Sequence, residues 1–364
     1  MDIAGNLPDH GIATFGDEIR ERTESRLKRY HDVAFDDVLE AIDWLAKPGD
    51  TIICGGSLVF GLGNRLSDLD ILFVGDQEWG NTRVPLEHFV NTLRVDSWRA
   101  TRPSIDEMFA LAEGALQSDA PLQGLFGDVH RDEELQLMHR IAFGIVLRGE
   151  ANEQHEARGR LAQRIAVREF MERCRHEIFL AQVSAKYGRR YAAVLASRRA
   201  VEDAVNAQIY SDAPFSQEKW LVDLVAGRPD LASRYEPFRS TPDLREHAEF
   251  TKRATDVCED LIGTVLDLKT LSSQCAWTGD LPQVFPIGSG HSVVGLGDGT
   301  HWPIEEREFD ALNRLLAHET KAWEFASCDE DEGRLCFELF ERGLIDLTWH
   351  ESLSHSGPEE AGSA

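Results

Sequence analysis

Positive charge is scarce in this sequence. The 364 residues include 64 acidic side chains against 38 basic ones, only seven of which are lysine, and the formal net charge is −26. A surface this acidic repels nucleic-acid phosphates and anionic lipid headgroups. The composition therefore argues against a nucleic-acid partner, a template-dependent polymerase included, and against a protein that binds membrane surfaces.

Paired cysteines and long apolar runs are also missing. The six cysteines stand at irregular intervals without a C-x-x-C pair, which argues against a zinc knuckle or a disulfide framework and for a reducing compartment. The N-terminus lacks the basic start and apolar stretch of a signal peptide, and no apolar run reaches the length of a membrane span. We expect a cytoplasmic protein with no membrane partner.

Changes in composition divide the sequence into four parts. Residues 1–150 mix helical patterns with short apolar runs typical of buried strands, and predict an α/β (α+β) domain with a short mixed sheet. Residues 151–275 are rich in Ala, Arg, Glu and Leu at helical spacing and predict an all-α domain. Residues 276–350 combine strand and helix patterns and predict a small winged-helix-like module, followed by a disordered tail at 351–364.

A glycine-rich turn stands at the start of the one segment that indicates chemistry. A short strand expected at 51–54 leads directly into Gly55-Gly56-Ser57. Glycines after a strand let the backbone approach a ligand closely, and a helix beginning there would offer free N–H groups to a phosphate. The Ser57 hydroxyl adds a hydrogen-bond donor. We interpret the turn as a phosphate cradle.

Two acidic residues follow on the next expected strand. Asp68 and Asp70 are two positions apart, so they project to the same face while Leu69 and Ile71 enter the core. Such a pair repels unless a proton, a basic partner or a divalent cation is present. Arg65, the nearest basic residue, could neutralise only part of it, and we expect Arg65 to help bind the nucleotide. Because Mg²⁺ prefers carboxylate oxygens and leaves positions for phosphate oxygens, the pair predicts a metal–nucleotide site.

Asp96 offers a third carboxylate, in the strand pattern Arg94-Val95-Asp96-Ser97-Trp98. It completes a three-acid site if its strand neighbours that of Asp68 and Asp70. The alternative is an exposed acid at a strand end with no role. An Asp-x-Asp alone is also weak evidence among 64 acids, and only its combination with the strand, the glycine turn and the spacer favours a metal site.

The order of strand, Gly-Gly-Ser, spacer (58–67) and Asp-x-Asp resembles the signature of the DNA polymerase beta-type nucleotidyltransferase superfamily. More narrowly, it resembles the small-molecule branch that includes the aminoglycoside and lincosamide nucleotidyltransferases. The resemblance covers residues 51–98 and implies an NTP co-substrate and two Mg²⁺ ions. It implies that Asp68 and Asp70 hold the nucleotide-bound metal, and that Asp96 joins the second metal and acts as general base toward an acceptor hydroxyl.

Such enzymes follow the catalytic domain with a helical one. In the expected helical region, Ser216-Gln217-Glu218-Lys219-Trp220 resembles a Lys-Trp element of several relatives. Lys219 would neutralise the triphosphate in that case, and the alternative is a solvated surface lysine. The expected acceptor is a small molecule, an antibiotic or another biosynthetic metabolite, and the excess of acid would suit a cationic one.

The sequence is also compatible with two other functions. The chain could be a peptide- or protein-binding regulatory protein on the same scaffold, or it could nucleotidylate a protein that the C-terminal module recruits. DNA binding by that module is disfavoured, because residues 301–350 contain thirteen acidic and five basic residues. A peptide or protein partner is the expectation for the module.

Overall fold

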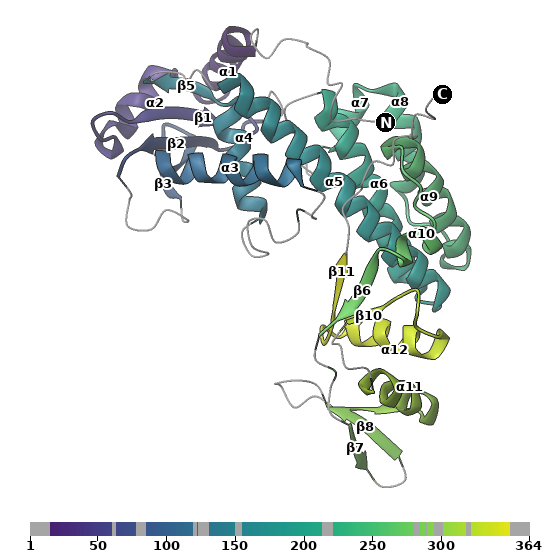
Figure 1. The fold of residues 1–364 in the computed structure, drawn as a ribbon. Helices are drawn as coiled ribbons and strands as arrows, with labels where there is room; N and C mark the ends of the chain where they lie inside the picture. The colour runs from purple at the N-terminus through teal and green to yellow at the C-terminus, as the bar shows by residue number, and fades with distance from the viewer. Residues whose placement is uncertain are drawn as a thin grey trace, which may run out of the picture. The chain divides into compact units, whose positions relative to one another are not determined.

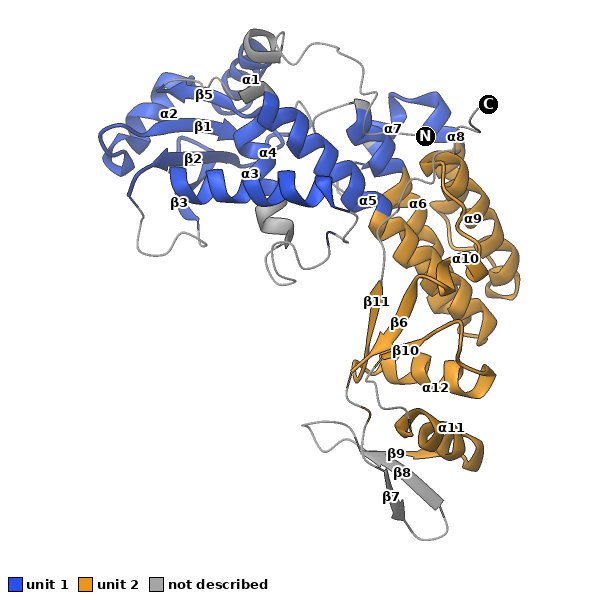
Figure 2. Ribbon diagram, in the orientation of Figure 1, with its two compact units in different colours: residues 1–171, 205–233, 357–364 blue, residues 172–204, 234–356 orange. Residues whose placement is uncertain are grey.

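We analysed a computed structural model of the chain. It describes residues 15–59, 63–77, 85–118, 122, 131–149, 155–212, 221–279, 281, 284–287, 290–294, 301–317 and 322–349. The predicted tail at 351–364 lies outside these residues. The chain forms two compact units, one of residues 1–171, 205–233 and 357–364, the other of residues 172–204 and 234–356 (Figure 2).

A mixed five-stranded sheet is the centre of the first unit. Its strands are β1 (Thr51–Gly55), β2 (Leu69–Gly75), β3 (Leu86–Val90), β4 (Leu93–Thr101) and β5 (Ile145–Arg148), in the order β3-β4-β2-β1-β5. Strands β2 and β4 pair in parallel, and the other neighbours are antiparallel. The three expected strands that carry the motif residues are present. Strand β3 was not predicted, because it lies at the sheet edge with much of its surface exposed and lacks a buried apolar run.

Helices cover both faces of this sheet (Figure 1). They are α1 (Phe15–His31), α2 (Phe35–Ile42), the 3₁₀ helix η2 (Asp43–Leu45), α3 (Arg102–Gln117) and α4 (Arg131–Phe143). Leu69, Ile71 and Phe73 of β2 pack with apolar residues of α1 and α2. Leu72 and Val74 pack with residues of α3 and α4 on the other face. Burial on both faces explains why the strand reads as a continuous apolar run.

The predicted helical region is helical. It contains α5 (His155–Lys186), α6 (Arg190–Asp212), α7 (Leu221–Ala226), α8 (Pro229–Tyr235), α9 (His247–Ile262) and α10 (Leu268–Ser272), with the short 3₁₀ helices η4 (Glu236–Phe238) and η5 (Leu244–Glu246). Helices α5 and α6 each contribute residues to both units. The domain boundaries at 150 and 275 stay predictions.

The C-terminal region contains more strands than the sequence indicated. Strands β6 (Cys275–Thr278), β10 (Ala322–Glu324) and β11 (Asp346–Trp349) form one sheet in the order β10-β6-β11. Strands β7 (Val284–Ile287), β8 (Gly290–Val294) and β9 (His301–Ile304) form a second, antiparallel sheet. The helices are α11 (Glu306–Leu316) and α12 (Glu330–Glu341). All six strands are short, and β7, β8 and β9 each contain a Gly or a Pro, which hides strands from pattern reading. The winged-helix-like arrangement stays a prediction.

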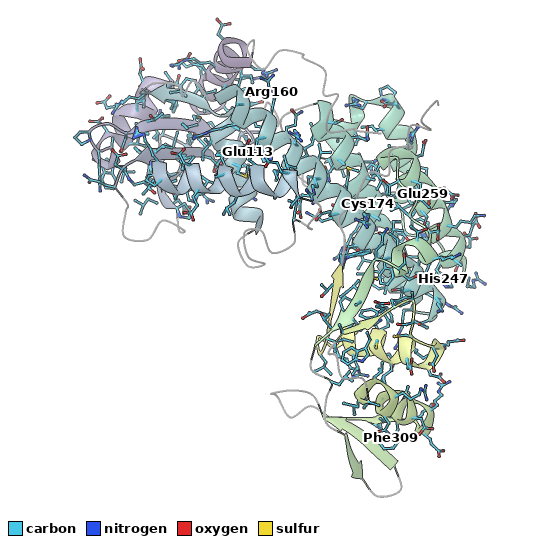
Figure 3. All side chains as sticks on the ribbon, in the orientation of Figure 1. Glu113, Arg160, Cys174, His247, Glu259 and Phe309 are labelled. Atoms are coloured by element: carbon cyan, nitrogen blue, oxygen red, sulfur yellow. The ribbon has the colours of Figure 1, made fainter. Side chains whose placement is uncertain are left out.

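All six cysteines are free thiols, and five are buried, among them Cys174 on α5 (Figure 3). Cys54 lies in the apolar core between the sheet and helices α1 and α2. Within the described ranges, no helix is both long and apolar enough to cross a membrane.

Candidate active site

One row of residues crosses four strands of the sheet. Gly55 on β1 lies opposite Asp70 on β2, Asp70 lies opposite Asp96 on β4, and Asp96 lies opposite Glu87 on β3. Asp68 immediately precedes β2. Carboxylate oxygens of Asp68, Asp70 and Asp96 all lie within 4.8 Å of one another. The parallel register of β2 and β4 therefore brings together the three acids that the sequence singled out.

The environment of Asp70 disfavours its negative charge. Burial raises the pKa of Asp70 above its ordinary value, and the charges of Asp68 and Asp96 raise it further, while the Arg140 guanidinium opposes both effects. Its side chain is only 11% exposed. Clustered carboxylates with this little access to water are stabilised by a divalent cation. Three oxygen ligands at this spacing fit Mg²⁺, with coordination positions left for other oxygens.

The two glycines make room for side chains of the chain itself. Gly56 adopts φ +87°, and a Cβ there would overlap the carboxylate of Asp70. A Cβ on Gly55 would lie 3.0 Å from Cγ of Arg140. Position 56 therefore needs glycine both for its left-handed backbone and for the close approach of Asp70.

No helix begins in residues 56–59, so the expected helix N-terminus is wrong there. The segment is a turn in which the Val59 N–H donates to the Gly56 carbonyl at 3.2 Å and the Gly63 N–H to the Ser57 carbonyl at 2.9 Å. Ser57 is buried. Leu58 and Val59 are fully buried and anchor the turn in the core.

Two arginines that sequence reasoning missed pair with two of the three acids. Arg140 Nη2 on α4 lies 3.4 Å from Asp70 Oδ2. Arg94 on β4 donates from Nε and Nη2 to the two oxygens of Asp96, at 2.9 and 2.6 Å, and Nε also lies 2.9 Å from Glu87 Oε1. Arg94 could have been found, because residues two apart on a strand share a face. Arg140 has no local signal that links it to Asp70, 70 positions earlier.

Two predicted nucleotide-binding residues are not placed at the acids. Arg65 is exposed before β2 and forms no ion pair with any of the three aspartates, all of which are described. Lys219 lies outside the described residues, as do positions 60–62 of the spacer. The roles of Arg65 and Lys219 stay predictions.

Comparisons with known proteins add little. No family model matches the sequence, and no curated protein matches it. Among solved structures, the chain is similar to a nucleotidyltransferase-like protein from Exiguobacterium sibiricum 255-15, with 13% identity over 63% of this chain and 74% of the other, at a TM-score of 0.36. A similarity this distant assigns neither a fold nor an activity to this chain.

Proposed function

We propose that the protein is an Mg²⁺-dependent nucleotidyltransferase that moves NMP from an NTP to a hydroxyl group of a small molecule and releases pyrophosphate. The observation that carries this proposal is the convergence of Asp68, Asp70 and Asp96 within 4.8 Å, on neighbouring parallel strands beside a glycine turn. Three carboxylates at this distance repel one another unless cations balance their charge. Here two arginines face them.

Asp68, Asp70 and Asp96 would have different roles in an in-line displacement at the α-phosphorus. Asp68 and Asp70 would hold the ion that accompanies the nucleotide, and Asp96 would help to hold a second. Bound Mg²⁺ supplies positive charge to the attacking and leaving oxygens. The acceptor oxygen forms a bond to the α-phosphorus. The bond between the α-phosphorus and the oxygen that bridges it to the β-phosphorus breaks, and its electrons leave with pyrophosphate. The acceptor proton passes to an Asp96 oxygen. Since Arg94 occupies both oxygens of Asp96, at least one of these hydrogen bonds must be released first.

A fourth acidic residue, Glu87, extends the row of carboxylates. Glu87 follows Asp96 in the cross-strand row, with its side chain 48% exposed, and the whole chain carries a net charge of −26. These charges support a cationic small-molecule acceptor. Docking of a peptide or protein to residues 276–350, and nucleotidylation of a protein acceptor, stay predictions.

The first prediction tests the metal site directly. The protein is incubated with each NTP, Mg²⁺ and hydroxyl-bearing amino sugars, and pyrophosphate release and the acceptor mass are measured. Asp68→Asn and Asp70→Asn each remove a metal-binding charge, so either should reduce pyrophosphate release at least ~100-fold. Asp43→Asn is the matched control, because Asp43 is an exposed acid of the same unit paired with Arg148. Undiminished release by both site variants would contradict the proposed function.

A further inference from the structure

Arg140 lies where the glycine turn meets the acids. Its Nη2 atom is 3.4 Å from Asp70, its guanidinium carbon is 4.4 Å from the centre of the Trp98 ring, and its Cγ would be 3.0 Å from a Cβ on Gly55. The side chain is 19% exposed. The stem of Arg140 therefore lies beside β1, and its guanidinium is held between the Trp98 ring of β4 and the Asp70 carboxylate of β2.

The hydrogen-bonding capacity of Arg140 is largely unused. A guanidinium has five N–H donors in a planar fork. Among the described residues, the contacts of the Arg140 guanidinium are the long ion pair with Asp70 and the Trp98 ring. Arg94 differs, because its guanidinium donates hydrogen bonds to both oxygens of Asp96 and also contacts Glu87. Arg140 is therefore the cation at this site that can accept an anionic ligand without losing a bidentate pair.

We propose that Arg140 binds the polyphosphate of the nucleotide, the task that the sequence suggested for Arg65 and Lys219. This inference rests on the proposed function. Without a ligand, Arg140 neutralises part of the charge on Asp70. Once a divalent cation takes that place, like charges repel the guanidinium from the metal, and the adjacent phosphate oxygens become its partners. Arginine suits this exchange, because its fork matches phosphate geometry and stays charged at every relevant pH.

The exchange gives Arg140 opposite effects on two ligands. Toward a bare dication it is a competitor, since both are drawn to Asp70. Toward a polyphosphate carried by that dication it is a binding residue. A residue that only balances the charge of Asp70 would show the first effect without the second.

The experiment uses the full chain, without nucleotide or acceptor. Binding of Mn²⁺ alone is measured by electron paramagnetic resonance, and binding of inorganic tripolyphosphate in the presence of Mg²⁺ by calorimetry. Arg140→Gln should tighten Mn²⁺ binding about threefold or more and weaken tripolyphosphate binding roughly tenfold or more. Arg148→Gln is the matched control, because it removes an exposed arginine from β5 of the same sheet and should change neither affinity.

The outcomes separate this inference from the proposed function. If the unaltered protein binds neither Mn²⁺ nor Mg²⁺-tripolyphosphate, the proposed function fails and this inference fails with it. If the unaltered protein binds both and Arg140→Gln does not weaken tripolyphosphate binding, Arg140 is only a counterion of Asp70 and this inference alone is overturned. Should Arg140→Gln not fold by circular dichroism, Arg140→Met decides the matter, because methionine keeps an unbranched apolar stem beside Gly55 and removes the charge. An unchanged tripolyphosphate affinity in that variant would overturn the assignment.

Discussion

The carboxyl group of Asp70 is both nearly buried and close to two other acids. Sequence reasoning identified all three acids, because side chains two apart on a strand face the same way and because apolar neighbours mark the strand. It attributed the glycines to ligand approach alone. The structure shows that Gly56 and Gly55 also admit Asp70 and Arg140, which no local pattern reveals.

Asp70→Asn should stabilise the metal-free protein. Burial and the neighbouring charges raise the pKa of Asp70 in the folded state, so the folded protein holds this proton more tightly than the unfolded chain does. Stability is therefore lost as the pH rises from the ordinary aspartate range through the raised pKa, and it stays lower above that range. The uncharged amide of the Asp70→Asn variant removes the free-energy cost of holding a buried negative charge at this position. In EDTA at neutral pH, the variant should unfold a few degrees higher by differential scanning calorimetry.

The pH dependence provides the control for this prediction. Below the ordinary aspartate pKa, the Asp70 carboxyl is protonated in both states, so the two proteins should unfold at nearly the same temperature. A stabilisation that persists undiminished at acidic pH would show that the effect is not electrostatic. A lower unfolding temperature at neutral pH would show that the Arg140 ion pair outweighs the repulsion.

At the scale of the elements, the alignment of β1, β2 and β4 decides the geometry of the site. A buried ion pair beside β1 holds this alignment. Asp50, directly before β1, accepts two hydrogen bonds from Arg99 of β4, at 2.7 and 2.5 Å, and both side chains are nearly inaccessible to solvent. The pair ties together strands that have β2 between them. Sequence patterns did not predict it, because the partners are 49 positions apart.

Asp50→Ala should destabilise the protein by about 3 kcal/mol, because it leaves the Arg99 charge buried without its carboxylate. The free energy of unfolding is measured in urea. Asp43→Ala breaks the exposed pair with Arg148 and should cost less than about 1 kcal/mol. Equal effects of the two substitutions would contradict the structural role of the buried pair.

At the scale of the whole molecule, the net charge of −26 is the dominant property. Like charges on a folded surface repel one another and oppose compactness, and salt screens that repulsion. Most of the arginines seen in exposed ion pairs contribute little to stability, because solvent already screens them. The acidic excess therefore costs stability at low ionic strength.

Raising NaCl from about 10 mM to about 300 mM should raise the unfolding temperature by a few degrees, since the screening length falls from ~30 Å to below 10 Å. The measurement is a thermal scan in EDTA, with an equal osmolality of glycerol as the control for non-ionic effects. A fall in the unfolding temperature with salt would indicate that attractive ion pairs outweigh the net repulsion.

The sequence by itself determined the strands β1, β2 and β4, the acids that they carry and the helical region that follows. These features depend on local patterns in the sequence, such as the alternation of apolar and polar residues, apolar runs, and glycines at the ends of strands and helices. Only the tertiary structure decided which strands are neighbours, and hence that Asp96 lies opposite Asp70, that Glu87 extends the row and that Arg140 and Arg94 meet the acids. The physical reason is that the partners and register of strands distant in sequence are set by core packing over the whole sheet, which no local segment encodes.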